Sequence, residues 1–135
     1  MFHLDERLAQ SSFLICDSKL SQVRLKNNAH FPWIILIPKV SSLITEWSEL
    51  HSDEQMMLMS EITHYSTILK QHFHADKINI GSLGNIVSQL HIHLVARFET
   101  DLLWPHSVWQ ANVPEKAYTE SEIKQLVKTF HKTLP

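Results

Sequence analysis

The chain has 135 residues, of which 44% are hydrophobic and 19% charged, and its formal net charge is −2. This composition predicts one globular domain over residues 1–135, with a core large enough to need no disulfide. A nucleic-acid partner is not expected, because Lys and Arg are not clustered anywhere in the sequence. The apolar runs 13–16 and 33–37 are far shorter than the ~20 residues of a membrane-spanning helix, so we expect no membrane association.

The cysteine count and the first residues of the sequence predict a cytoplasmic location. Cys16 is the only cysteine, which excludes an internal disulfide and is typical of a reducing compartment. The sequence begins Met-Phe-His-Leu-Asp-Glu, without the basic flank and apolar stretch of a signal peptide. Because Cys16 lies in the run Phe-Leu-Ile-Cys, we expect a buried, unreactive thiol.

The first third of the chain predicts short elements. Apolar periodicity indicates strands at 12–17, 22–26 and 33–37, and short helices at 5–10 and 41–47. The second and third strands are separated by a turn sequence, Asn-Asn-Ala, and a short polar link, so they are expected to pair as an antiparallel hairpin.

The middle of the chain contains the clearest predicted helix. Ser52-Asp53-Glu54-Gln55 has the pattern of a capping box, with its acidic residues at the positive end of the helix dipole. Apolar residues then recur at spacings of three and four as far as about His74, which predicts one buried face. The residues of that face are Met56, Met59, Ile62, Tyr65, Leu69 and Phe73.

Strands are expected at 77–82 and 86–98, with the chain's two glycines, Gly81 and Gly84, forming the turn between them. A second capping box at 119–122 begins a predicted C-terminal helix. Its apolar face is Ile123, Leu126, Val127, Phe130 and Leu134. The sequence therefore predicts an α+β fold of about five mostly antiparallel strands with a long central helix. Residues 1–100 would form the core, and 101–135 a C-terminal extension.

The run 85–97 is the most informative part of the sequence. In a strand, alternate side chains point to opposite faces, so Gln89, His91 and His93 would share one face. The other face would carry only the hydrocarbon side chains of Leu90, Ile92 and Leu94. An apolar face of this kind is typical of a buried surface, and the polar face is a candidate site of chemistry.

The face that carries Gln89, His91 and His93 has three possible interpretations. The first is a solvated edge strand without a function. The second is a metal site, but a closed site needs further ligands, and the nearest downstream acid is Glu99, six residues after His93. No metal and no cofactor are therefore expected. The third is nucleophilic catalysis, because a neutral imidazole can attack phosphorus and form a covalent intermediate. In that case Gly81 and Gly84 would let the backbone approach the phosphate closely.

The flanking residues favour the third interpretation through a resemblance. Gln89-Leu-His91-Ile-His93-Leu-Val resembles the His-φ-His-φ-His-φ-φ signature of the histidine triad (HIT) family of nucleotide hydrolases and transferases, with Gln in the first position. The segments 84–97 and 104–109 resemble a bacterial subgroup described as diadenosine tetraphosphate hydrolase-like, and 27–38 resembles the hairpin of these proteins.

The resemblance implies a mechanism and a set of site residues. His91 would attack the α-phosphorus of a nucleotide, and water would then release the nucleoside monophosphate. His93 would bind phosphate oxygen and assist the leaving group. The remaining implied nucleotide contacts are Asn27 or Asn28 for the ribose, Gly84 and Asn85 for the phosphates, and Asn79, which matches the family's Asn ahead of the glycine turn.

Two further implications concern the partner and the level of activity. Proteins of this family and size are commonly homodimers, so Trp104 and Trp109 are candidates for dimer packing or for contact with the base. Gln89 can form hydrogen bonds but cannot titrate near neutral pH. Two hypotheses follow: an enzyme with reduced but retained activity, or a nucleotide-binding or interaction protein that has lost turnover.

Overall fold

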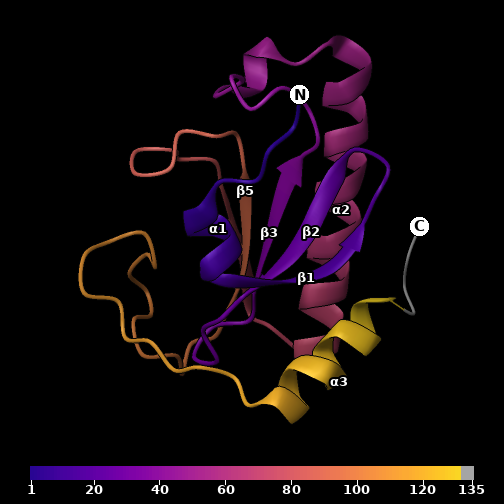
Figure 1. Ribbon diagram of the computed structural model, residues 1–135. Helices are drawn as coiled ribbons and strands as arrows, with labels where there is room; N and C mark the ends of the chain where they lie inside the picture. The colour runs from indigo at the N-terminus through magenta and orange to yellow at the C-terminus, as the bar shows by residue number, and fades with distance from the viewer. Residues whose placement is uncertain (132–135) are drawn as a thin grey trace.

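The computed structural model describes residues 1–131, in which five strands form one sheet with the order β1-β2-β3-β5-β4 (Figure 1). Every neighbouring pair is antiparallel, so the predicted α+β architecture with a five-stranded antiparallel sheet is confirmed. The strands are β1 (Ser12–Asp17), β2 (Ser21–Lys26), β3 (Trp33–Pro38), β4 (Lys77–Gly81) and β5 (Ile92–Arg97).

Helices cover both faces of the sheet. The long helix α2 lies behind the strands in Figure 1, and α3 packs on the same face through an apolar cluster that includes Leu69 and Phe130. The short helix α1 lies on the opposite face, where Leu8 joins a second apolar cluster with Phe31 and Val95. The helices are α1 (Glu6–Gln10), η1 (Trp47–Glu49), α2 (Ser52–Phe73) and α3 (Glu120–His131). No helix within residues 1–131 combines the length and the apolar character of a membrane span.

Helix α2 follows the prediction in length but not in every detail. Its capping box lies one residue earlier than predicted, because the Glu54 carboxylate accepts a hydrogen bond from the backbone N–H of His51 (2.9 Å). Its buried face is centred on Leu58, which is fully buried, whereas Met56 is 73% exposed. At 100° per residue, Met56 points about 200° away from Leu58, so the two cannot share a face. Met59 is also exposed, contrary to the prediction.

The predicted helix at 41–47 is wrong. Residues 41–46 contain no helix, and the one helical turn near this position is η1, which begins at Trp47. The Glu49 carboxylate accepts hydrogen bonds from the backbone N–H groups of Thr45 and Glu46, which caps the start of η1. The capping box predicted for α3 is present, since Thr119 and Glu122 exchange hydrogen bonds. Leu134, which the prediction included in that helix, lies outside the described residues.

The predicted strand 86–98 is also wrong in its first half. Only Ile92–Arg97 form β5, and residues 82–91 form a loop, called here the 82–91 loop. Gly84 has a φ of +80°, a conformation that favours glycine, and the backbone N–H of Leu90 binds the carbonyl of Ile44 rather than a strand. Alternation does hold within β5, where Leu94 faces α2 and Val95 faces α1.

Candidate active site

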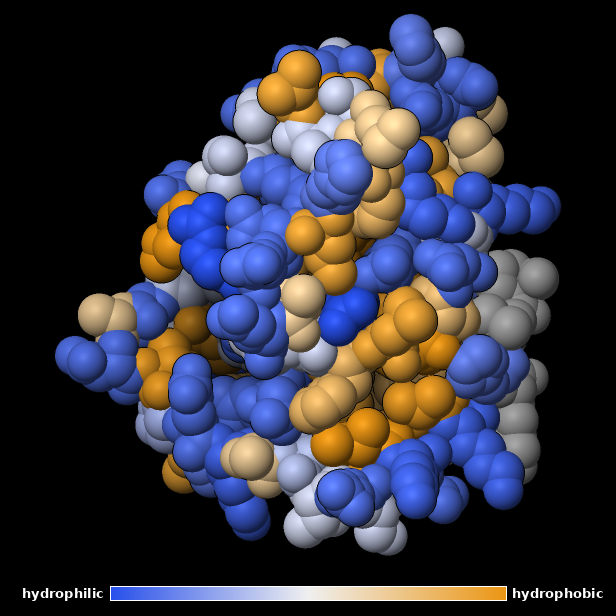
Figure 2. All heavy atoms as spheres, in the orientation of Figure 1, coloured by the Kyte–Doolittle hydropathy of each residue, from blue (hydrophilic) through white to orange (hydrophobic). Residues whose placement is uncertain are grey.

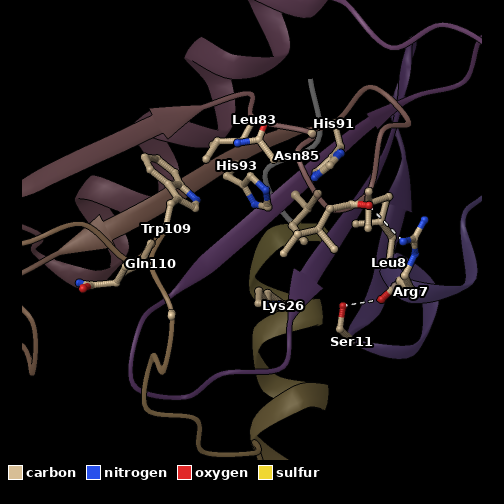
Figure 3. Close-up of a pocket in the computed structure, with 16 residues that line it drawn as sticks. Arg7, Leu8, Ser11, Lys26, Leu83, Asn85, His91, His93, Trp109 and Gln110 are labelled. Atoms are coloured by element: carbon tan, nitrogen blue, oxygen red, sulfur yellow. Dashed lines mark hydrogen bonds between the residues drawn. The ribbon is translucent and has the colours of Figure 1, made fainter.

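A cavity of about 560 Å³ opens on the α1 side of the sheet. Its walls are α1, the 82–91 loop and residues 108–111 of the C-terminal extension, and the strands beneath contribute Lys26, Ile35 and His93. His91 lies at the end of the 82–91 loop, directly before β5. Figure 2 shows a hollow with an apolar interior to the left of centre, and Figure 3 shows the imidazoles of His91 and His93 in the cavity.

His91 is held in one tautomer by the backbone. Its side chain is buried, with 5% exposure, and its Nδ1 lies 2.6 Å from the carbonyl oxygen of Gln89. A carbonyl oxygen only accepts hydrogen bonds, so the proton of neutral His91 is on Nδ1. The Nε2 atom therefore carries a free lone pair, which is the form of imidazole that acts as a nucleophile.

His93 is held in the opposite tautomer by Trp33. The antiparallel register places Trp33 opposite Val95 and Ile35 opposite His93, so Trp33 and His93 lie diagonally on one face. The indole Nε1 of Trp33 donates a hydrogen bond of 2.9 Å to Nδ1 of His93. Because an indole nitrogen only donates, Nδ1 must accept, and the proton of neutral His93 is on Nε2.

The two imidazoles are neighbours with complementary roles. Their ring centroids are 4.8 Å apart. Burial lowers the pKa of His91 below its ordinary value of 6.5. Burial, with smaller contributions from His91 and Lys26, lowers the pKa of His93 to about 3. Both rings are therefore neutral at pH 7, and the cavity holds a free lone pair beside an N–H donor.

Two basic side chains, Lys26 and Arg7, line the cavity. Lys26 lies at the end of β2, with its Nζ 5.2 Å from the ring centroid of Trp33, and burial lowers the pKa of its amine while Glu115 opposes that shift. Lys26 forms no ion pair with any described residue. Arg7, from α1, is paired with Asp5 at 2.9 Å and also donates to the carbonyl of Ile86.

Several residues implied by the resemblance do not line the cavity. The Asn27 side chain accepts a hydrogen bond from the backbone N–H of Tyr118, and the Asn28 side chain donates one to the carbonyl of Pro114. These asparagines therefore fasten the C-terminal extension to the hairpin. Asn79 accepts a hydrogen bond from Arg97. Gln89 is buried next to the cavity, but its amide binds the N-terminal residues.

Gly84, Asn85 and Trp109 do line the cavity, together with His91 and His93. Gly81 has a role different from the expected approach to phosphate. A Cβ at this position would lie 2.8 Å from the Trp109 ring, so the glycine makes room for that indole. The Trp109 ring lies 6.0 Å from that of His93, and its Nε1 is buried without a hydrogen-bond partner in the described part of the chain.

Trp104 is not part of the cavity wall. Its ring lies 5.9 Å from the guanidinium of Arg97, which is 1% exposed and is paired with Asp101 at 2.8 Å. The backbone carbonyl of His106 accepts a further hydrogen bond from Arg97. Trp104 and Arg97 therefore help to hold the start of the C-terminal extension against the sheet.

Sequence reasoning missed Arg7, Lys26 and Trp33. The position of Lys26 in the sequence could have indicated a place near the site, because it ends an alternating strand and directly precedes Asn27 and Asn28. Trp33 gave no such signal, since an aromatic residue at the start of an apolar strand is typical of a core position. Arg7 reaches the cavity only through the tertiary contact between α1 and the 82–91 loop.

Comparison with known proteins agrees with this geometry. A model of the HIT domain matches residues 7–100. A histidine triad protein from Sinorhizobium meliloti is 40% identical, with a TM-score of 0.93, and the match covers 98% of this chain and 97% of that one. One from Marinobacter aquaeolei is 37% identical, with a TM-score of 0.94, and coverage of 99% and 96%.

A third histidine triad protein, from Bradyrhizobium japonicum, is 34% identical, with a TM-score of 0.92 and coverage of 98% of both chains. No curated protein matches the chain. The family match spans more than half of the sequence, and it includes the loop and strand that carry both cavity histidines. The chain belongs to the HIT domain family, whose members are generally nucleotide-binding proteins, hydrolases or transferases.

Proposed function

We propose that the protein is a nucleotide hydrolase or nucleotidyl transferase that acts through a covalent intermediate on His91. One observation carries this proposal: the cavity places the free Nε2 of His91 beside the N–H donor of His93. A nucleophile for phosphorus and a donor for phosphate oxygen are the two groups that such a displacement needs.

In the first step, the Nε2 lone pair of His91 attacks the α-phosphorus, and the bond from phosphorus to the leaving group breaks. The Nδ1–H of His91 stays bonded to the Gln89 carbonyl, which stabilises the positive charge that forms on the ring. In the second step, water attacks phosphorus, and the N–P bond breaks. His91 regains its lone pair, and the proton from water leaves with the nucleoside monophosphate or to solvent.

The charges around the cavity suit a substrate with several phosphates. Lys26 is free to pair with a phosphate oxygen, and Arg7 adds a second positive charge on the α1 wall. The buried Nε1 of Trp109 is one more donor that a bound anion can use. Lys26 and His93 would therefore hold the phosphates while the opposite end of the nucleotide contacts the apolar part of the wall.

The tautomer of His93 also bears on the leaving group. Trp33 already occupies Nδ1 of His93, so His93 is poorly suited to carry a second proton and pass it on. A phosphate leaves as an anion, with a second pKa of about 6. An amine needs a proton to leave, because its conjugate acid has a pKa of about 10. We therefore propose phosphoanhydrides as substrates, in particular dinucleoside polyphosphates such as diadenosine tetraphosphate, in preference to phosphoramidates.

The alternative hypothesis of a binding protein without turnover depended on Gln89. Both polar groups of the Gln89 amide bind backbone atoms of residues 3 and 5, and the side chain does not line the cavity. Its inability to titrate is therefore no reason to expect loss of turnover, and we prefer the enzymatic function.

We also propose that the protein is a cytoplasmic homodimer. Cys16 is a buried free thiol, which suits a reducing compartment. Ile80, on the edge strand β4, and Met59, on α2, are large apolar side chains that are about half exposed in the single chain. An interface between two copies of the chain would cover these side chains. Light scattering in solution should give twice the mass of one chain, and a monomer would contradict the assembly.

The covalent intermediate is the direct test of the proposed reaction. Intact-protein mass spectrometry, after a reaction with diadenosine tetraphosphate is quenched in denaturant at alkaline pH, where the N–P bond is stable, should show a mass increase of one adenylyl group. His91→Ala should lose both the adduct and turnover. His72→Ala, at an exposed histidine on α2, is the matched control and should keep both. Equal turnover by the wild-type protein and His91→Ala would contradict the proposal.

A further inference from the structure

Gln89 joins two parts of the chain that are more than 80 residues apart. Its Oε1 accepts a hydrogen bond of 2.8 Å from the backbone N–H of Asp5, and its Nε2 donates one of 2.8 Å to the carbonyl of His3. The side chain is 7% exposed, so these bonds are largely shielded from water. The side-chain amide of Gln89 thus binds backbone groups of residues 1–5, called here the N-terminal segment. It offers them one acceptor and one donor, as the backbone of a neighbouring strand would.

The N-terminal segment leads directly into a wall of the cavity. The Asp5 carboxylate accepts a hydrogen bond of 2.8 Å from the backbone N–H of Arg7 and so caps α1. It also pairs with the Arg7 guanidinium at 2.9 Å, and the hydrogen bonds from Arg7 lower the pKa of Asp5. Arg7 then donates to the carbonyl of Ile86 at 3.0 Å, which returns the contacts to the 82–91 loop (Figure 3).

The backbone of Gln89 is the second half of the arrangement. Its carbonyl oxygen is the atom that holds Nδ1 of His91 and fixes the tautomer of the nucleophile. One residue therefore binds the N-terminal segment with its side chain and His91 with its main chain. Movement of the Gln89 side chain would disturb both Arg7 on one wall of the cavity and the orientation of His91 at its centre.

From these contacts we infer that Gln89 is a positioning residue, which fastens the N-terminal segment to the 82–91 loop and thereby fixes Arg7 and His91. The inference rests on the proposed function only in taking this cavity as the nucleotide site. Glutamine suits the task because its donor and acceptor lie on one planar group and face backbone atoms two residues apart. A neutral histidine has its donor and acceptor on different edges of the ring, and glutamate has no donor.

The first test measures structure without any ligand. In Gln89→Ala, amide hydrogen exchange should become faster in three regions: the N-terminal segment, α1 and residues 86–91. Deletion of residues 1–4 should accelerate exchange in α1 and residues 86–91 in the same way. Gln71→Ala, at an exposed glutamine on α2, should leave all three regions unchanged. Faster exchange confined to the N-terminal segment would overturn the inference.

The second test measures binding of AMP by calorimetry. Gln89→Ala and the deletion of residues 1–4 should each weaken binding about tenfold, and the combined variant should be no weaker than either one. In an Arg7→Ala background, Gln89→Ala should weaken binding by less than the tenfold expected in the wild-type protein, because the part of its effect that acts through Arg7 is already lost and only the part through His91 remains. Fully additive losses, or unchanged affinity in both single variants, would overturn the inference.

The two proposals fail in different ways. If the protein binds AMP but hydrolyses no nucleotide, the proposed reaction is wrong, and both the binding and exchange comparisons still test Gln89. If Gln89→Ala does not fold, the deletion of residues 1–4, which leaves Gln89 in place, supplies the same comparisons. If the wild-type protein binds no AMP, the exchange measurements alone decide whether Gln89 fixes α1 and the 82–91 loop.

Discussion

The indole Nε1 of Trp33 lies 2.9 Å from Nδ1 of His93 and donates a hydrogen bond to it. This contact determines what His93 can do, because a partner that only donates leaves the proton of neutral His93 on Nε2. The same contact opposes protonation of Nδ1, and burial acts in the same direction on the pKa of His93. We therefore expect Trp33 to be a positioning residue, which would act on the proposed substrate through His93.

Replacement of Trp33 by phenylalanine tests this relationship. Phe keeps an aromatic ring in the buried position but removes the N–H, so His93 should populate both tautomers and its pKa should rise. Loss of a correctly oriented donor should reduce kcat by about tenfold, which corresponds to ~1.4 kcal/mol of transition-state stabilisation. Nitrogen-15 NMR of the imidazoles reports the tautomer directly. An unchanged His93 spectrum in Trp33→Phe would contradict the assignment.

The pH dependence of the reaction should reflect the depressed pKa of His91. In the proposed reaction the neutral ring is the nucleophile, so activity should be lost as the pH falls through the pKa of His91 in the folded protein. Burial places that pKa below 6.5, against smaller opposing effects of the Gln89 carbonyl and Asp5, while the charge of Lys26 lowers it further. We expect kcat/KM to stay constant down to below pH 6.5. An acidic limb centred above pH 6.5 would show that another group controls the rate.

Lys26 should contribute to binding through its charge. Lys26→Gln keeps a polar side chain of similar length but removes the cation, so the KM for a dinucleoside polyphosphate should rise about tenfold. The affinity for the uncharged nucleoside adenosine should change little, and binding of the polyphosphate should become less sensitive to salt. Lys124→Gln, at an exposed lysine on α3, is the charge-matched control. Equal effects of the two substitutions would mean that only net charge matters.

The limits of the sequence predictions have a common physical cause. Apolar periodicity indicates which side chains are buried, and it correctly placed the hairpin, the extent of α2 and the facing of β5, although Met56 and Met59 of α2 are exposed. It does not report where the backbone groups pair. Alternation continues through residues 86–91, but these backbone groups bind Arg7, Ile44 and His91 instead of a strand.

The positions of the candidate site residues show the same limit. Motif spacing brought His91 and His93 together, and both line the cavity. The resemblance implied that Asn27 or Asn28 contacts the ribose, which stays a prediction. Their partners are Tyr118 and Pro114, more than 80 residues away, and no local pattern reveals such contacts. The same is true of the contact between Gln89 and the N-terminal segment.

The buried pair of Arg97 and Asp101 should make stability depend on acidic pH. Burial alone would raise the pKa of Asp101, but hydrogen bonds from Arg97 and from three backbone N–H groups lower it to about 2, from 3.8. The folded protein therefore binds fewer protons than the unfolded chain in this range. The contribution of ionised Asp101 to the free energy of unfolding is therefore fully present above about pH 4, and it is lost as the pH falls toward 2.

Asp101→Asn should remove this dependence together with much of the stability. It leaves the Arg97 guanidinium, 1% exposed, without its counter-charge, which should lower the free energy of unfolding at pH 7 by about 3 kcal/mol. Urea titrations of both proteins at several pH values would measure the difference, which should shrink as the pH falls below 4, because Asp101 of the unfolded wild-type chain then binds a proton that the folded protein takes up only near pH 2. Asp53→Asn, at an exposed residue in the first turn of α2, should change stability by less than about 1 kcal/mol. The opposite result would be free energies of unfolding of Asp101→Asn and the wild-type protein that differ by the same amount from pH 7 to pH 3. That result would mean that the carboxylate stabilises the fold through its shape and not its charge.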